Sequence, residues 1–394
     1  MDAAQGHQRT VAAGLRGHDN SFGVLRLFLA SSVIFSHAFY LGGWREDPTL
    51  GLTRGQETIG GWAVVGFFVI SGYLITKSGA SADIVQFLWR RVLRIFPAFW
   101  VALAVGALLV GPIVWLNMGR SLGEYMSTAP GGPVGYVTAN WKLAIHQWGV
   151  HDIFIATTPY GEATGASVFN GSLWTLEYEW RAYMIIAVLV LLGVLRRAPW
   201  LILACLAIFY SAALGAAFAP SIFPRVSVEF SDRFFVNLTL AFLLGATLAV
   251  FGPRVVLDGR LALAAGALVV VTLAVRGWVL VGYPAFAYLL IYTAARLPAG
   301  WRKIGAKNDY SYGMYVYGFL VQQFTAYWGW HKWGYVPWVA DTLLVTAGCA
   351  VVSWHLVEKP ALRLKAWCPG VGIRRIASEI QSRLLLWRRP PPDA

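Results

Sequence analysis

The stretch that decides the fold is Phe22-Gly-Val-Leu-Arg26-Leu-Phe-Leu-Ala-Ser-Ser-Val-Ile-Phe-Ser-His37-Ala-Phe-Tyr-Leu-Gly-Gly43, which is long enough to cross a bilayer as one helix. Arg26 and His37 are eleven residues apart. That spacing is three turns plus about 20°, so both side chains leave the same face, about 16 Å apart along the axis. Ionisable groups inside a membrane are costly, and the pair indicates a functional site facing the bundle interior. The alternatives are that Arg26 extends to the headgroups and that His37 is a packing residue.

The composition is that of a membrane protein. The chain has 394 residues, of which 57% are hydrophobic and only 13% charged, and 19 are Trp. Soluble domains carry about twice that share of charged residues, and Trp is typical of membrane interfaces. The net charge of +13 comes from loops and a terminal tail, so it does not indicate nucleic-acid binding. The three cysteines have no metal-ligand spacing, and no metal site is predicted.

The rest of the chain predicts an all-α polytopic bundle with about ten transmembrane helices. An even number of spans places both termini on one side of the membrane, and far more Lys and Arg residues fall in the segments on that side. The positive-inside rule therefore makes both termini cytoplasmic. The apolar segments lie near 22–43, 60–78, 95–117, 173–195, 200–219, 234–251, 258–275, 278–296, 311–329 and 338–357.

Three regions follow from this layout. Residues 1–21 form a cytoplasmic N-terminal segment, and residues 22–357 form the membrane domain. Within it, the extracytoplasmic loop 117–171 is rich in Gly, Pro and aromatics and is longer than an ordinary connection, which favours a lid or acceptor-binding role. Residues 358–394 form a basic tail, in which isoleucines and leucines at three- to four-residue spacing predict an amphipathic helix on the inner leaflet.

Depth along the helices suggests where chemistry takes place. Counted from the ends of their spans, His37 and Glu179 lie at similar depths near the outer edge. A carboxylate beside an imidazole fixes its tautomer and strengthens it as a general base, so the pair is a catalytic hypothesis. Glu177 precedes Arg181 by four residues, which favours an ion pair within the helix.

At the inner edge, Arg91 and Arg94 are placed three residues apart on one helical face. Arginine pairs of this kind hold phosphates through forked hydrogen bonds, and Arg26 lies at a depth where it joins them. The alternative is that these arginines only set the topology. Ser71 lies among small residues of the second span, which favours close helix packing over a nucleophilic role.

Taken together, these motifs resemble the acyltransferase-3 family of membrane sugar O-acyltransferases. The similar segments are Arg26 and His37 with ten residues between them, Phe67-Phe-Val-Ile-Ser-Gly-Tyr-Leu-Ile75, Arg91-Val-Leu-Arg94-Ile-Phe-Pro97, Asn170-Gly-Ser-Leu-Trp174-Thr-Leu-Glu-Tyr-Glu179 with Tyr183, Ser311-Tyr-Gly-Met-Tyr315 and Glu358-Lys-Pro360. One departure is Gly318, where many members of the family carry a histidine.

The resemblance implies an enzyme of the inner (cytoplasmic) membrane of a bacterium. It would transfer an acyl group, most simply acetyl, from cytoplasmic acyl-CoA to a carbohydrate hydroxyl of a surface or exported glycan. Acyl-CoA is then a co-substrate, and no bound cofactor is expected. His37 and Glu179 would be catalytic, and Arg26, Arg91 and Arg94 would bind the donor. Acceptor-binding or structural roles fall to Ser71, Asn170, Trp174 and Tyr183.

Two other functions remain open from sequence. One is a transporter of a sugar or anionic substrate, which the inner arginine pair and the lack of internal repeats disfavour. The other is a non-catalytic subunit that works with glycan-assembly proteins. The expected partners are the lipid bilayer, acyl-CoA and a carbohydrate acceptor, with no nucleic acid.

Overall fold

The computed structural model describes residues 10–17, 20–80, 83–127, 131–218 and 228–367. Every regular element in this part of the chain is a helix, and the only extended pairing is an isolated bridge between Thr10 and Val256. The all-α prediction is therefore confirmed for the described residues. The predicted amphipathic helix of the tail lies outside them.

Seven helices of the described part are long and apolar enough to cross a membrane. They coincide with seven of the ten predicted spans. These are α2 (Phe22–Leu41), α4 (Ile59–Gly79), α5 (Ile84–Val105) continued by η1 (Gly106–Val110) and α6 (Gly111–Asn117), α12 (Leu201–Phe218), α14 (Arg233–Val250), η3 (Trp278–Gly282) with α16 (Tyr283–Arg296), and α19 (Tyr335–Ser353) continued by η5 (Trp354–Glu358), α20 (Lys359–Arg363) and η6 (Leu364–Ala366).

The other three predicted spans are also helices, but each has only 17 residues: α10 (Thr175–Leu191), α15 (Gly259–Val275) and α18 (Ser311–Tyr327). At about 1.5 Å per residue such a helix is about 25 Å long, shorter than the hydrocarbon core. A count of ten spans and the cytoplasmic placement of both termini therefore stay predictions. Nearly every residue of α18 is buried, so protein rather than lipid surrounds it.

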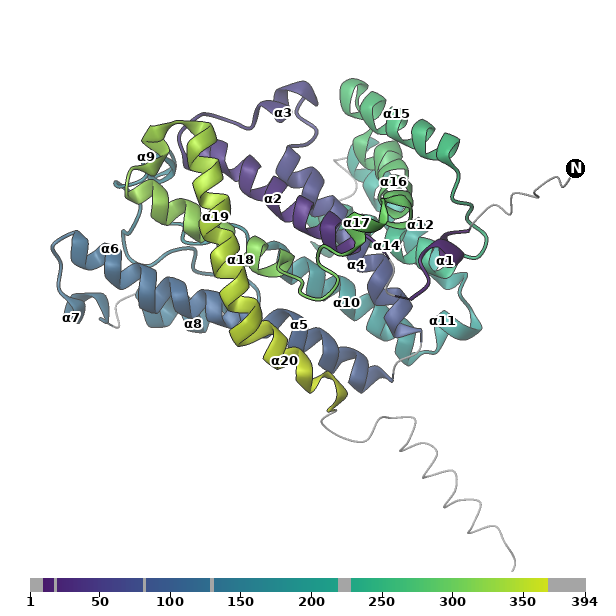
Figure 1. The fold of residues 1–394 in the computed structure, drawn as a ribbon, viewed down its shortest axis with the longest axis horizontal. Coiled ribbons are helices and arrows are strands. Elements are labelled where there is room, and N and C mark those ends of the chain that lie inside the picture. The colour runs from purple at the N-terminus through teal and green to yellow at the C-terminus, as the bar shows by residue number, and fades with distance from the viewer. Residues whose placement is uncertain (1–9, 18–19, 81–82, 128–130, 219–227, 368–394) are drawn as a thin grey trace, which may run out of the picture.

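Glycines bring the central helices into close contact. A Cβ atom on Gly72 of α4 would lie 1.9 Å from the backbone oxygen of Phe242 in α14, so only glycine fits there. A Cβ atom on Gly318 of α18 would lie 2.7 Å from the Ile34 side chain of α2. The departure from the family pattern at Gly318 thus coincides with close packing of α18 on α2. Figure 1 shows α18 among α2, α5 and α19, all of which it contacts.

The described residues of the predicted loop 117–171 pack against the bundle, with α8 (Pro133–Asn140) on α5 and α9 (Pro159–Thr164) on α2. The region also contains α7 (Leu122–Tyr125), and its aromatic side chains Tyr125, Tyr136, Phe154 and Phe169 are buried. Tyr136, one of the aromatics of this region, therefore packs inside the protein. The remaining short helices are α1 (Val11–Gly14), α3 (Pro48–Leu52), α11 (Val194–Arg197), α13 (Val228–Ser231), α17 (Ala299–Arg302) and η4 (Trp330–Trp333).

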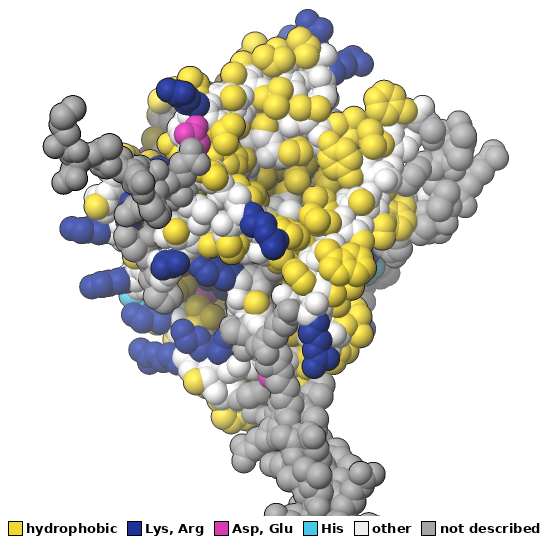
Figure 2. Space-filling model, turned by 90° about the vertical axis from the view of Figure 1, so that its right-hand side faces the viewer, with side chains coloured by type: hydrophobic (Ala, Val, Ile, Leu, Met, Phe, Trp, Pro, Cys, Tyr) yellow, Lys and Arg dark blue, Asp and Glu magenta, His cyan; other side chains and the backbone are white. Residues whose placement is uncertain are grey.

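The surface of the molecule divides by polarity. Figure 2 shows one face on which most Lys and Arg side chains gather in the lower left part, whereas hydrophobic side chains cover much of the upper and right-hand part. Large hydrophobic side chains such as Leu263, Val270 and Leu344 are more than two-thirds exposed. Exposure of this extent is typical of a lipid-facing surface and not of a water-facing one.

Candidate active site

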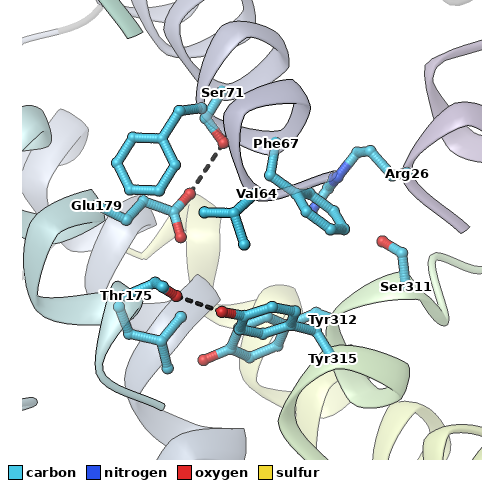
Figure 3. A pocket seen from close by; sticks show the side chains of 11 residues that line it. Arg26, Val64, Phe67, Ser71, Thr175, Glu179, Ser311, Tyr312 and Tyr315 are labelled. Carbon is cyan, nitrogen blue, oxygen red and sulfur yellow. Dashed lines mark hydrogen bonds between the residues drawn. The ribbon is translucent and has the colours of Figure 1, made fainter. Parts of the chain in front are cut away.

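A cavity of about 40 Å³ lies between α2, α4, α10 and α18 (Figure 3). We call it the central cavity. Its volume accommodates only a few water molecules. The lining combines an arginine and a carboxylate with several hydroxyls and aromatic rings: Arg26, Val64, Phe67, Phe68, Ser71, Thr175, Leu176, Glu179, Ser311, Tyr312 and Tyr315. Three of the predicted site residues, Arg26, Ser71 and Glu179, thus come together from three different helices.

Glu179 is the acidic group of the central cavity. Its carboxylate accepts a hydrogen bond from Ser71 Oγ at 2.9 Å and a second one from the Tyr183 hydroxyl. Tyr183 follows Glu179 by four residues on α10, so the helix itself aligns the two side chains. Ser71 reaches across from α4, and it is a hydrogen-bond donor to the acid in addition to lying in the packed part of that helix.

The predicted pairing of His37 with Glu179 is wrong, because the two side chains lie at different depths. α2 and α4 run antiparallel, and a Cβ atom on Gly60 would lie 2.8 Å from Ser36 Oγ, so His37 is level with the start of α4. Ser71, the partner of Glu179, is eleven residues further along α4. At about 1.5 Å per residue that separation is about 16 Å. Glu179 therefore lies at the Arg26 end of the bundle.

The reason is that the segment before α10 already lies deep in the protein. Asn170 is buried, and its Nδ2 donates to the Val316 carbonyl oxygen of α18 at 2.7 Å. Thr175, the first residue of α10, shares a hydrogen bond with the Tyr315 hydroxyl. α10 thus begins inside the bundle and not at its edge, which moves Glu179 inward. The Asn170 side chain is thus engaged in a contact with α18.

His37 lies at the other end of the bundle. Its ring packs edge-on against Phe319 of α18, with 5.3 Å between the ring centroids, and Phe319 in turn contacts Tyr160 of α9. The Nδ1 atom of His37 is buried and has no hydrogen-bond partner among the described residues. Phe319 follows Tyr315, which lines the central cavity, by one turn of α18.

A second depression, of about 160 Å³, adjoins the central cavity and shares Arg26 and Ser71 with it. We call it the arginine recess. Besides these two residues it is lined by Leu74, Ile75, Arg90, Arg91, Arg94, Tyr183, Leu362 and Lys365. The Nε atoms of Arg90 and Arg91 are buried without a hydrogen-bond partner in the part of the chain that the structure describes. The Arg91 guanidinium lies over the Tyr183 ring, 6.0 Å from its centroid.

Arg26 and Arg94 are joined by an acid that the sequence analysis missed. Asp309 Oδ2 accepts a hydrogen bond from Arg26 Nη1 and one from Arg94 Nη2, each at 2.7 Å. Arg94 also pairs with the buried Glu358 at 3.3 Å. Burial alone would raise the pKa of Asp309, but the two arginines outweigh it and lower that pKa to about 2. A sequence signal for Asp309 did exist: it is a carboxylate two residues before Ser311, whose hydroxyl can orient it, at the start of a predicted apolar span.

The structure also shows the surroundings of two further residues considered in the sequence, Glu177 and Trp174. Arg181 pairs with Glu177, as the four-residue spacing predicted. Trp174 is half-buried, and its ring packs against Tyr178 and Phe234. Among the described residues no group of three or more His, Cys, Asp or Glu side chains is placed to hold a metal ion.

Comparison of the whole chain with known proteins indicates acyl transfer. A family model described as an acyltransferase domain, acyltransferase-3, matches residues 19–358. Nodulation protein 10 of Rhizobium leguminosarum bv. viciae is 30% identical over 381 residues, which cover 89% of this chain and 95% of that protein. An O-acetyl transferase of Shigella phage Sf6 is 29% identical over 349 residues, covering 86% of this chain and 95% of that protein. No solved structure matches the chain.

Proposed function

The chain belongs to the acyltransferase-3 family and is an O-acyltransferase with several apolar helices that can span a membrane, and we propose that it transfers an acetyl group from cytoplasmic acyl-CoA to a carbohydrate hydroxyl. In this proposal it is a multi-pass protein of a bacterial inner membrane, with both termini in the cytoplasm. The Arg26 end of the bundle then faces the cytoplasm, and the His37 end faces outward.

The observation that carries the proposal is the junction between the arginine recess and the central cavity. The recess offers the guanidinium groups of Arg90 and Arg91, whose Nε atoms have no partner among the described residues. Guanidinium groups bind phosphates in pairs of parallel hydrogen bonds, and acyl-CoA carries a diphosphate and a ribose phosphate. Because Arg26 and Ser71 line both spaces, the arm of a donor held in the recess has a direct continuation into the cavity.

The central cavity suits the arm of the donor better than it suits a sugar. The cavity as it stands holds only a few water molecules, so either ligand requires its lining to open; an unbranched pantetheine arm with two amide groups requires less opening than a branched glycan does. Glu179, oriented by Ser71 and Tyr183, is placed to accept an amide hydrogen bond from such an arm. We therefore assign Glu179 to donor binding within this proposal, in place of a partnership with His37.

His37 is the proposed general base for the acceptor. Its Nδ1 atom has no described partner that would compete for a proton. The imidazole takes the proton of the sugar hydroxyl as its oxygen attacks the thioester carbonyl carbon; the C–S bond breaks, and the imidazolium returns the proton to the CoA thiolate. The extended arm has to cover about 16 Å from the level of Arg26 and pass the Tyr315 and Phe319 rings.

The aromatic surroundings of His37 support a carbohydrate acceptor. Tyr160 lies next to Phe319, and Trp44 packs against Tyr335 at the same end of the bundle. Rings of this kind stack on sugar faces, and O-acetyl transfer is the activity in the name of the Shigella phage relative. The acceptor is therefore proposed to be a glycan hydroxyl, with glycan-assembly proteins as partners.

The experiment measures CoA release from acetyl-CoA by purified protein supplied with isolated surface glycan, together with CoA affinity. Arg91→Ala is expected to weaken CoA binding by about tenfold, as loss of one charge-assisted contact implies. Arg254→Ala, a change of another arginine that does not line the recess, is the matched control. His37→Ala is expected to lower kcat by about 10²–10⁴-fold while CoA affinity stays at the wild-type value.

Two results would contradict these assignments. Equal CoA affinity in wild type and Arg91→Ala would show that Arg91 does not bind the donor and acts only as a charge that sets the membrane topology. Near-normal transfer in His37→Ala would remove it as the base. An intact thioester in the wild-type reaction would favour transport or a non-catalytic assembly role over acyl transfer from CoA.

A further inference from the structure

The Arg26–Asp309–Arg94 bridge stands where three spaces meet. Arg26 lines both the central cavity and the arginine recess, and Arg94 lines the recess. Asp309 lines a third depression of about 690 Å³, the loop recess, formed mainly by residues 303–311 and by Gly23 and Leu27 of α2. Any ligand that extends from the recess into the cavity must therefore pass beside this bridge.

The two oxygens of Asp309 have different partners. Oδ2 accepts from both guanidinium groups, at 2.7 Å each. Oδ1 accepts from the Ser311 hydroxyl at 2.5 Å and from the Ser311 backbone N–H at 3.2 Å. Ser311, two residues further along the chain, thus orients the carboxylate independently of the arginines. One of its oxygens occupies the point where two guanidinium groups converge, which is where an oxygen of a bound phosphate would also sit.

The bridge is only partly shielded from water. The side chains of Arg26, Arg94 and Asp309 are 21%, 15% and 20% exposed. Arg26 uses one of its five N–H groups in the described contacts, so most of its donors remain available. An anion that enters the arginine recess can therefore reach these guanidinium groups without unfolding a helix.

We propose that Asp309 is an internal substitute for a phosphate of the donor: it holds Arg26 and Arg94 when no donor is bound, and a phosphate of acyl-CoA takes its place on them when the donor binds. This inference rests on the proposed function, in which acyl-CoA is the donor. Asp309 is then a positioning residue that acts through the two arginines and sets the affinity for the donor.

The local charge balance favours such an exchange. Five cationic side chains line the arginine recess: Arg26, Arg90, Arg91, Arg94 and Lys365. The acids paired with them are Asp309 and Glu358. The recess keeps an excess of positive charge, and a diphosphate brings two negative charges and more acceptor oxygens than one carboxylate does. Because the carboxylate competes with the ligand for the same donors, its removal has to tighten binding of the ligand.

The test is the sign of the change in CoA affinity. For Asp309→Asn in purified full-length protein, the Kd for CoA is expected to fall about tenfold, which corresponds to about 1.4 kcal/mol. The KM for acetyl-CoA is expected to fall with it while kcat does not rise, since the product CoA is held more firmly. A residue that only organises the arginines gives the opposite sign, so an unchanged or higher Kd overturns the proposal.

A second variant covers the case in which Asp309→Asn does not fold. Ser311→Ala keeps the carboxylate but removes one of the hydrogen bonds that orient it, and CoA is expected to bind about threefold more tightly. Weaker or unchanged binding in Ser311→Ala overturns the proposal as well. The matched control is Asp152→Asn, which breaks another Asp–Arg bridge, to Arg120, beyond the far end of α6. Its CoA affinity is expected to equal that of the wild type.

Failure of this inference and failure of the proposed function give different results. Wild-type protein that does not bind CoA at all contradicts the donor assignment itself. If the wild type binds CoA and Asp309→Asn binds it equally or less tightly, the donor assignment stands. Only the proposal that Asp309 takes the place of a donor phosphate is then wrong.

Discussion

Tyr183→Phe is the perturbation that most directly tests the orientation of Glu179. Tyr183 has two contacts at the site: its hydroxyl donates to the Glu179 carboxylate, and its ring lies beside the Arg91 guanidinium. Phenylalanine keeps the ring and removes only the hydroxyl. The variant therefore separates the hydrogen bond to the acid from the contact with the arginine.

The magnitude follows from the type of hydrogen bond. A hydrogen bond to a charged group contributes about 1.5–3 kcal/mol. If the oriented carboxylate binds the donor arm, that loss corresponds to a rise of the acetyl-CoA KM by about 10- to 150-fold. Ser71 Oγ still donates to the carboxylate in this variant, so the lower half of the range is expected.

The assay is the KM and kcat for acetyl-CoA with purified protein, alongside its thermal unfolding midpoint. Tyr288→Phe is the matched control, because it removes a tyrosine hydroxyl that donates to the Val256 carbonyl oxygen at 2.8 Å outside the site. The control is expected to keep the wild-type KM.

A double variant sharpens the test. Ser71→Ala with Tyr183→Phe removes both described hydroxyl donors from Glu179, so its effect on KM is expected to exceed the sum of the single effects. The reasoning is refuted if Tyr183→Phe has the wild-type KM and kcat, or if the control raises KM by as much.

Three further predictions concern packing, pH and sidedness. Gly318→Ala is expected to lower the free energy of unfolding by about 1–3 kcal/mol, because the new Cβ would lie 2.7 Å from Ile34; adding Ile34→Val should recover part of the loss in thermal unfolding. The pKa of Asp309 is lowered from 3.8 to about 2, so its charge stabilises the fold above pH 4. That contribution, about 2 kcal/mol, is expected to disappear between pH 4 and pH 2 in wild type and to be absent in Asp309→Asn. Cysteines introduced singly at positions 142 and 303 are expected to differ in labelling by an impermeant thiol reagent on intact cells, with reaction only at 142; the reverse pattern would contradict the proposed cytoplasmic donor site.

The sequence by itself determined the helical membrane architecture. Long apolar segments require helices, since each backbone N–H and C=O in hydrocarbon must be satisfied within the segment. All ten predicted segments are helical in the structure, and seven meet the length and apolarity of a span. Local spacing was equally reliable: the Glu177–Arg181 ion pair depends only on the helical repeat, and it forms.

The depth of a side chain within the bundle could not be predicted from the sequence. The position of Glu179 was counted from the expected start of its span, but Asn170 and Thr175 are bonded to α18 well inside the bundle. A polar segment that enters the membrane region is stable only when other helices satisfy its hydrogen bonds, and those helices are distant in sequence. The predicted pairing of His37 with Glu179 failed for this reason.

The tertiary structure alone decided which charges meet. Arg26, Arg94 and Asp309 are spread over 283 residues of chain, and no local pattern relates them. They converge because the start of α18 packs against both α2 and α5: Arg26 lies near the beginning of α2, Arg94 in the middle of α5, and Asp309 just before α18. Two guanidinium groups have to be neutralised there on partial burial. The sequence supplied the residues and their order along each helix. The packing of helices that are far apart in the chain made Asp309 the common partner of Arg26 and Arg94.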